Sequence, residues 1–284
     1  MDEQRLAADN FHIETTESNL NLNYQMDMNA FDEENPGQFS IEANGTLGKN
    51  DIVRFTQDMT SDFQRAWPDH PTDIDLVAHG NLQELNIDRL DAQMDGQFSI
   101  SGNGTLTNLT DPNGNIGMDM NLHTSGNNLD FIRQFMPADA AGAFRLPRGT
   151  TIDGSIQMKN GNLHADATLH NGGQKAHIKA NYNTNNDAYI IDLTAHNLAI
   201  HQYVSMDEPC HITGHVYAKG QGFDFDNPRT FCNAKADISH VDYSSYYLNN
   251  TTATAHLQHQ RLDARMDFAD SRLDGHLEIG RAHV

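Results

Sequence analysis

Sixteen histidines and two cysteines are the residues of this sequence best suited to bind a metal ion. Their closest grouping is Cys210-His211-x-x-x-His215, in which the two imidazoles share one face of a predicted strand. Residues four apart on a strand are separated by ~13 Å, which is too far for both to ligate one zinc ion. Other histidines alternate with apolar residues or stand at strand ends, which predicts a solvated polar face: His164, His170, His177 and His196. We therefore expect no metal and no cofactor.

Cys210 and Cys232 could form a disulfide in an oxidising compartment, provided that their strands are neighbours. The turn-forming segment Gly220–Pro228 lies between them and permits such a pairing. The alternative is two unpaired thiols, because a bridge requires Cα atoms within ~7 Å of each other.

The residue patterns of common enzymes are missing. There is no phosphate loop, nucleotide-binding fingerprint or nucleophile elbow. The segment Asp111–Asn115 resembles a calcium loop only in part, since its Gly is misplaced and no bidentate Glu follows. Carboxylate pairs are expected by chance among 39 Asp and Glu, so we expect no enzyme. The formal charge of −21 repels phosphate backbones, and we predict no nucleic-acid partner.

One stretch of the chain occurs twice. Gly37–Leu47 returns as Gly96–Leu106, 59 residues later, with two of eleven positions changed. In each copy a Phe and an Ile stand one residue apart, so that both point to the same side of a strand. The Asn-Gly pair that follows tolerates positive φ and is expected to break or bend the strand. This duplication predicts a repetitive architecture.

Alternation of apolar and polar residues runs through most of the chain from Leu20 onward. It predicts about sixteen strands with one dry and one wet face. Turns that contain Asn-Gly or Gly-Gly predict antiparallel hairpins. Short helices are expected at Asp51–Trp67, with Asp51 as a candidate cap, and at Leu129–Met136, and a third short helix or a loop is expected at Leu198–Val204. A change of parity near Leu90 indicates a β-bulge.

A sheet of so many strands must shield its apolar face from water. It can do so either by curling into an open trough or by closing as a sandwich. We predict an all-β fold, an elongated antiparallel β-groove (β-taco) of curled amphipathic strands with a few short helices. The residues expected to line the groove are Leu22, Tyr24, Met26, Phe39, Ile41, Phe98, Ile100, Met118, Met120, Ile156, Met158, Leu163, Leu169, Ile178, Ile191 and Leu193.

Gly-punctuated alternating strands, Asn/Asp-rich turns and short helices such as Leu129–Met136 and Leu198–Val204 resemble the TamB-like translocation and assembly proteins. These proteins belong to the AsmA-like group of bridge-like lipid-transfer proteins. The resemblance covers most of residues 10–277, and we treat residues 1–277 as one section of a repetitive β-groove domain. The usage of Asn, Asp and His resembles that of Bacteroidota proteins. The resemblance favours the open groove over the sandwich.

The resemblance implies a non-enzymatic protein of the periplasm and cell envelope. Its groove would carry phospholipid acyl chains between the inner and outer membranes, or would assist the assembly of outer-membrane proteins. The implied partners are phospholipid, an outer-membrane barrel, and the inner membrane through an N-terminal anchor that is missing from this sequence. The alternative hypothesis is a structural or adhesive surface β-protein that binds glycans or partner proteins through Tyr243, Tyr246 and Tyr247.

The last residues break the alternation. Glu278–Val284 resembles a translated sequencing-library adapter joined to a truncated gene, so residues 278–284 are set aside from fold reasoning as an artefact. The alternative interpretation is an ordinary strand end.

Overall fold

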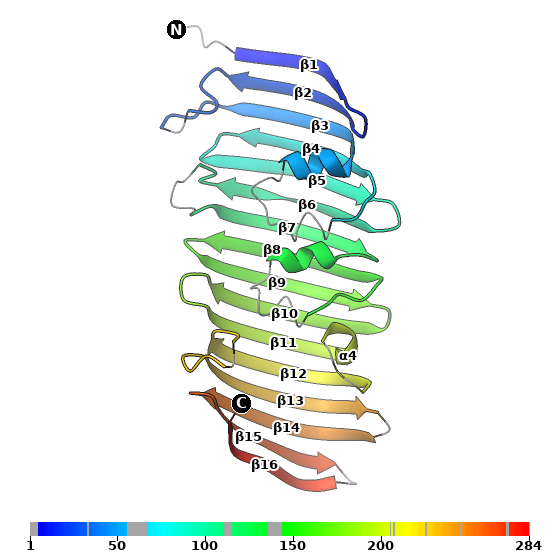
Figure 1. The fold of residues 1–284 in the computed structure, drawn as a ribbon, viewed down its shortest axis with the longest axis vertical. Helices are drawn as coiled ribbons and strands as arrows, with labels where there is room; N and C mark the ends of the chain where they lie inside the picture. The colour runs from blue at the N-terminus through cyan, green and yellow to red at the C-terminus, as the bar shows by residue number, and fades with distance from the viewer. Residues whose placement is uncertain are drawn as a thin grey trace. The chain divides into compact units, whose positions relative to one another are not determined.

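The structure is a computed structural model, and it describes residues 5–32, 34–55, 67–110, 115–135, 144–204, 206, 208–224, 226–244, 246–270 and 273–283. Its strands pair in sequence order, from β1 to β16, in one sheet (Figure 1). The order begins at β1 and ends at β16 without pairing them, so the sheet is not closed. The prediction of an all-β, antiparallel fold with a few short helices is confirmed.

The chain divides into two compact units. Unit 1 comprises residues 1–135 and 151–160. Its elements are β1 (Arg5–Glu14), β2 (Asn19–Asp27), β3 (Phe39–Leu47), α1 (Lys49–Phe55), β4 (Thr72–Gly80), β5 (Glu84–Met94), β6 (Phe98–Thr107), β7 (Gly117–Gly126), η1 (Asp130–Phe135) and β8 (Thr150–Lys159).

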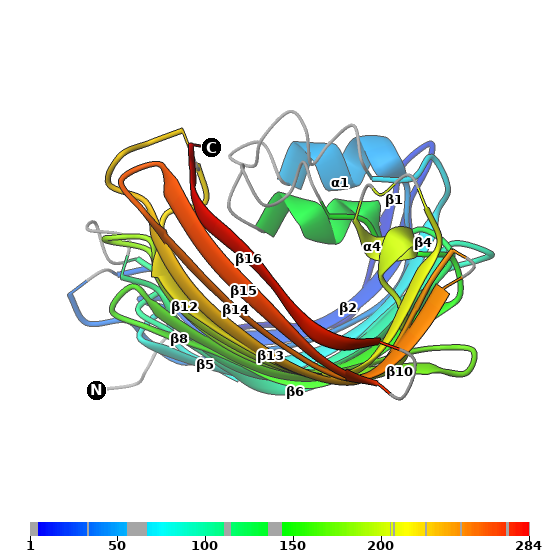
Figure 2. The ribbon, with the colours of Figure 1, turned by 90° about the horizontal axis from the view of Figure 1, so that it is seen from below.

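Unit 2 comprises residues 136–150 and 161–284. Its elements are β9 (Asn162–Asn171), β10 (Gln174–Asn183), β11 (Ala188–Ala199), α4 (Ile200–Tyr203), β12 (Cys210–Gln221), β13 (Phe231–Tyr243), β14 (Tyr246–Gln258), β15 (Arg261–Asp270) and β16 (Leu273–His283). In both units the strands curve, and the helices lie on the concave side (Figure 2).

The Asn-Gly pairs of the duplicated stretch do not end their strands. Gly45 lies inside β3 with φ 141° and Gly104 inside β6 with φ 155°. A side chain at either position would overlap the carbonyl oxygen of the neighbouring strand, that of Asn19 or of Asp119. Both copies of the stretch therefore need glycine at the same place, because the backbones approach too closely for a Cβ.

Asp51 does not cap its helix. The helix α1 starts at Lys49, which places Asp51 inside the first turn. Its carboxylate instead accepts hydrogen bonds from the hydroxyls of Ser18 (2.5 Å) and Thr15 (2.6 Å) in the β1–β2 turn. These hydrogen bonds, with that from Ser18 first, lower the pKa of Asp51. The contact ties the start of α1 to the edge of the sheet.

All three expected helices are found in place, and the third is shorter than expected. The structure has α1 at Lys49–Phe55, while residues 56–66 of the expected Asp51–Trp67 helix lie outside the described residues. The second helix is the 3-10 helix η1, and its expected last residue, Met136, also lies outside them. The third shrinks to α4, Ile200–Tyr203, because β11 extends to Ala199.

Candidate functional site

The concave face of unit 2 is apolar from its first strand to its last. Directly paired residues of antiparallel strands share a face, so the register places side chains in rows across the sheet. Two rows contain no polar side chain: Ala165, Ala180, Ile191, Ala218, Ala234, Ala255, Ala264 and Ile279 form one, and Ala167, Ile178, Leu193, Val216, Ala236, Ala253, Met266 and Leu277 form the other.

The opposite face of the same strands is polar. The row between these two apolar rows, on the other side of the sheet, consists of Asp166, Lys179, Asp192, Tyr217, Lys235, Thr254, Arg265 and Glu278. This difference follows from the alternation in the sequence, since successive side chains on a strand point to opposite faces. Unit 2 therefore has one water-facing wall and one hydrocarbon-like wall.

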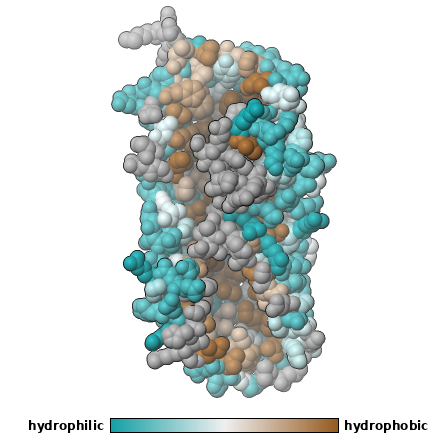
Figure 3. Space-filling model, viewed as in Figure 1, coloured by the Kyte–Doolittle hydropathy of each residue, from teal (hydrophilic) through white to brown (hydrophobic). Residues whose placement is uncertain are grey.

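Unit 1 has the same construction. One of its rows consists of Leu6, Met26, Phe39, Gly80, Leu85, Leu106 and Met118, and another of Phe11, Leu22, Ala43, Leu76, Leu90, Gly102 and Leu122. Figure 3 shows apolar residues gathered on this face of each unit between polar margins. In both units the alternating pattern has produced an apolar wall.

All sixteen residues expected to line a groove lie on these apolar walls, and the burial of each shows how far the wall is filled. Phe98, Met120 and Leu169 are buried, whereas the other thirteen are only half-buried. In a closed sandwich a second sheet would cover such residues and remove them from solvent. The described residues instead leave most of the wall in contact with solvent.

Aromatic side chains cover part of the wall in unit 1. The rings of Trp67, Phe98 and Phe131 pack against one another with centroids 5.0 to 5.3 Å apart. Leu129 and Met94 are almost fully buried, with 2% and 1% of their surface exposed. This cluster packs Trp67 and the helix η1 against the sheet, and it accounts for the burial of Phe98.

In unit 2 the covering groups stand at the ends of the strands. Phe223, in the β12–β13 connection, stacks on Tyr189 with ring centroids 4.7 Å apart. At the other end Phe144 stacks on Tyr203 of α4, and Phe144 pairs with Val204 in an isolated bridge. These contacts leave the middle of β12 to β15 uncovered.

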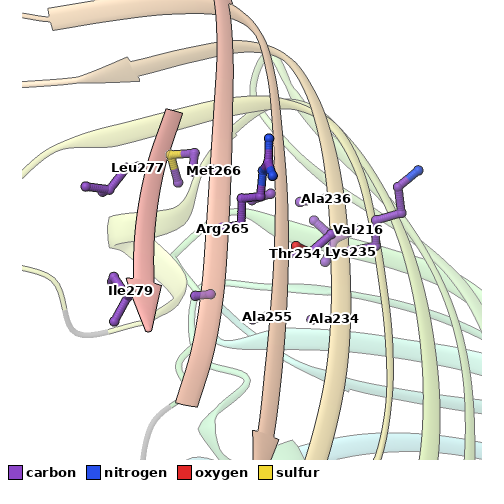
Figure 4. Close-up of a pocket in the computed structure, with 12 residues that line it drawn as sticks. Val216, Ala234, Lys235, Ala236, Thr254, Ala255, Arg265, Met266, Leu277 and Ile279 are labelled. Atoms are coloured by element: carbon purple, nitrogen blue, oxygen red, sulfur yellow. The ribbon is translucent and has the colours of Figure 1, made fainter. Parts of the chain in front are cut away.

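An apolar recess lies on this uncovered part of unit 2 (Figure 4). It has a volume of about 240 Å³ and is bordered by β12 to β16. An engineered cavity of ~150 Å³ is enough to hold benzene. Its apolar lining consists of Val216, Ala234, Ala236, Ala253, Ala255, Ala264, Met266, Leu277 and Ile279. The short alanine side chains leave an empty volume above them, and the larger apolar side chains surround it.

None of these recess residues was among the expected lining residues. The strands that carry them were expected, but alanine contributes little apolar surface, so Ala234–Ala236 or Ala253–Ala255 stand out weakly from a polar background. The recess became identifiable only from the register, which brings alanines of three strands together.

The histidines lie where the sequence predicted. His164 pairs with Asn181 across β9 and β10 at 2.8 Å, and His177 with Asp166 at 2.7 Å, both on the polar face. His215 bonds Asp192 at 2.9 Å, while the ring of His211 lies against that of His201 with centroids 5.3 Å apart. In the described part of the chain, no three His, Cys, Asp or Glu side chains converge to hold a metal ion. Residues 111–114 of the calcium-like loop are outside that part.

The possible disulfide is not formed. Both cysteines are free. Cys210 pairs with Tyr243 at one end of the β12–β13 ladder, and Cys232 pairs with Gly220 at the other end. Ten residues of strand separate Cys210 from Gly220, which amounts to ~33 Å. Of the two alternatives that the sequence left open, the structure therefore has the unpaired thiols, because the two cysteines stand near the starts of antiparallel strands, at opposite ends of the hairpin.

The three tyrosines of the alternative hypothesis are exposed, but they do not form one strip. Tyr246 has 75% of its surface exposed, Tyr247 52% and Tyr243 45%. Tyr243 pairs directly with Tyr246, so these two share a face, while Tyr247 points to the opposite one. Tyr247 lies near His240, with ring centroids 6.4 Å apart.

Within the segment 278–284, which is interpreted above as an artefact, residues 278–283 belong to β16, and Val284 lies outside the described residues. That strand continues to His283 and pairs with β15 from Asp270 to Arg261, with one irregularity after Leu262.

Among the described residues, no helix has the length and apolar composition needed to cross a membrane. Comparison with protein-family models, curated proteins and solved structures finds no match for the chain.

Proposed function

We propose that this chain is a section of a lipid-carrying β-groove, a non-enzymatic wall along which phospholipid acyl chains lie. The observation that carries this proposal is the pair of unbroken apolar rows across β9 to β16, whose residues remain half-exposed. Each methylene removed from water gains about 0.8 kcal/mol, so an acyl chain on such a wall is held by many small contributions.

The chemistry of the wall favours a hydrocarbon over a peptide or a glycan. The backbone N–H and C=O groups of β10 to β15 already bond to their neighbouring strands. The two rows offer no polar side chain to a ligand. A peptide or sugar bound there would leave polar groups unpaired, at a cost of about 1–3 kcal/mol each. An acyl chain has no such groups.

The resemblance to TamB-like proteins supplies the setting of the proposal. We place the protein in the periplasm and cell envelope, where its ligand would be phospholipid moving between the inner and outer membranes. An outer-membrane barrel and an inner-membrane anchor belong to the same proposal, as does the assisted assembly of outer-membrane proteins. What supports it in this chain is the repetitive, open, amphipathic sheet.

The direct test is mass spectrometry of an organic extract of the purified protein. We expect co-purified phospholipid. The variant Ile191→Lys places a charge on the apolar wall and should lower the bound lipid at least about tenfold, equivalent to ~1.4 kcal/mol. Thr194→Lys adds the same charge to the polar face of the same strand and is the matched control. A lipid-free extract, or equal loss in both variants, would contradict the proposal.

A second candidate function rests on Tyr243 and Tyr246. These exposed rings lie side by side at the tip of the β13–β14 hairpin, an arrangement that suits stacking on a sugar ring. In this candidate the chain is an adhesive or structural surface protein that binds glycans or partner proteins. Glycan-array binding that is lost in Tyr246→Ala and unaffected by Ile191→Lys would favour it.

A further inference from the structure

The acidic residues of the chain are distributed unevenly between its two units. Unit 1 contains 7 Lys and Arg against 24 Asp and Glu, a formal charge of −17. Unit 2 contains 11 against 15, a formal charge of −4. The apolar walls of the two units are alike, so the difference concerns the polar groups around them. A ligand on the apolar wall of unit 1 is therefore surrounded by more negative charge than a ligand on the wall of unit 2.

Many of these carboxylates stand at the rims of unit 1, which are the two margins where its strands begin and end. Six of them are exposed in turns or at strand ends: Glu14, Glu17, Asp32, Glu34, Glu84 and Asp95. They occur at both rims, since the β1–β2 and β5–β6 turns lie at one margin and the β2–β3 and β4–β5 turns at the other. The apolar wall is thus bordered by negative charge on both sides.

Three arginines among the described residues of unit 1 are each paired with a carboxylate. Arg5 forms an ion pair with Asp27, with 3.0 Å between Nε and Oδ1. Arg54 pairs with Asp51 at 3.7 Å. Arg89 is held on the polar face by Asp75, at 2.9 Å. Each of these guanidinium groups already faces a carboxylate of the protein, so its field is largely compensated locally.

We infer that the lipid carried by unit 1 has a headgroup without net negative charge, a zwitterionic phospholipid rather than an anionic one. This inference rests on the proposed function. An acyl chain on the apolar wall keeps its headgroup in water, at the mouth between the two rims. Coulomb repulsion from carboxylates within about one Debye length, ~8 Å at 0.15 M salt, then penalises an anionic headgroup. A zwitterion carries no net charge and is not repelled in this way.

The test offers both headgroups at once. The full chain is incubated with vesicles of equimolar dioleoyl phosphatidylcholine and dioleoyl phosphatidylglycerol, re-isolated, and its bound lipid is counted by mass spectrometry. Because the acyl chains are identical, any preference reports the headgroup. We expect about threefold more phosphatidylcholine at 0.15 M salt and a ratio near one at 1 M salt, where the Debye length falls to ~3 Å.

Two charge-reversal variants locate the effect. The rim variant combines Glu14→Lys, Glu34→Lys and Asp95→Lys, whose side chains are exposed at the strand ends. The face variant combines Glu42→Lys, Asp91→Lys and Asp119→Lys, which are exposed on the polar face and change the net charge equally. At 0.15 M salt the rim variant should lose the preference and the face variant should keep it.

The outcomes separate the inference from the proposed function. Lipid bound in equal amounts at 0.15 M, a preference that persists at 1 M salt, or a preference lost equally in both variants would overturn the inference and leave lipid binding intact. Absence of either lipid from the re-isolated protein would overturn the proposed function itself.

Discussion

Trp67 packs edge-on against Phe98, with ring centroids 5.3 Å apart and ring planes at 73°. Phe98 belongs to the apolar wall of unit 1, and Trp67 is the single tryptophan of the chain. The indole of Trp67 is therefore an intrinsic fluorophore in contact with that wall. Its emission should respond to any ligand that binds next to it.

We predict that phospholipid with bromine on its acyl chains quenches the fluorescence of Trp67. Bromine must come close to the indole to quench it, so quenching shows that acyl chains reach this part of unit 1. The measurement is steady-state emission, with the unbrominated lipid as control. Equal emission with both lipids, under conditions where lipid is bound, would show that the aromatic cluster keeps acyl chains away.

Filling the recess of unit 2 should weaken lipid retention there. Ala255→Phe places a large ring among Ala234, Ala236 and Ala264. Displacement of about two methylenes from the wall costs ~1.6 kcal/mol, so we expect retention to fall roughly tenfold. Thr252→Phe, the control, adds the same ring to the polar face of the same strand at a position that does not line the recess. Lipid retention unchanged in Ala255→Phe would show that the recess is not used.

Alanine at the duplicated glycines should destabilise the protein. Gly45→Ala and Gly104→Ala each force a Cβ against a neighbouring carbonyl oxygen at positive φ. We expect each to lower the free energy of unfolding by at least about 2 kcal/mol. Gly173→Ala is the control, because a Cβ there would meet nothing within 4 Å. Urea unfolding measures all three, and equal effects would refute the close-approach explanation.

The pKa of Asp51 predicts how its contribution to stability depends on pH. Because hydrogen bonds from Ser18 and Thr15 lower this pKa, the carboxylate stabilises the fold above its ordinary pKa, and the contribution is lost as pH falls through the lowered value. Asp51→Asn should therefore lower the Tm at pH 7, and this effect should shrink as the pH falls below the ordinary pKa of 3.8. Asp69→Asn, at an exposed position, is the control. A difference in Tm that does not shrink with acidification would contradict the explanation.

Both cysteines should react as free thiols. We expect two thiols per chain under denaturing conditions without a reductant. In the native Cys232→Ser variant, the remaining Cys210 should react slowly, because burial and then the charge of Asp242 raise its pKa and lower the fraction of reactive thiolate. A count of zero thiols would show a disulfide and would contradict the register of β12 and β13.

Most strands could be predicted because their alternation is uninterrupted, and the change of parity near Leu90 was correctly interpreted as a bulge. The strand β1 was not predicted, because a bulge interrupts its alternation. Its apolar residues Leu6 and Ala8 have one parity and Phe11 and Ile13 the other, because the register shifts at a bulge that includes Asn10, with φ 57°. A short strand with a bulge in its middle loses the period that identifies it.

The composition of the apolar wall was predictable, but the extent of its exposure was not. Ile178 and Leu193 show by their spacing that they share a face, but spacing does not tell whether another segment covers them. That depends on where Trp67, Phe131 and Phe223 fold back, which is decided by long connections without a period. The recess was missed because alanine marks it only weakly.

Each strand pairs only with the strands before and after it in the chain. Every hairpin can therefore assemble from residues that are already close in sequence, and the loss of one strand removes direct partners from only two others. We expect the sheet to form and to unfold in steps along the chain. The local stability is then set by each pair of neighbouring strands.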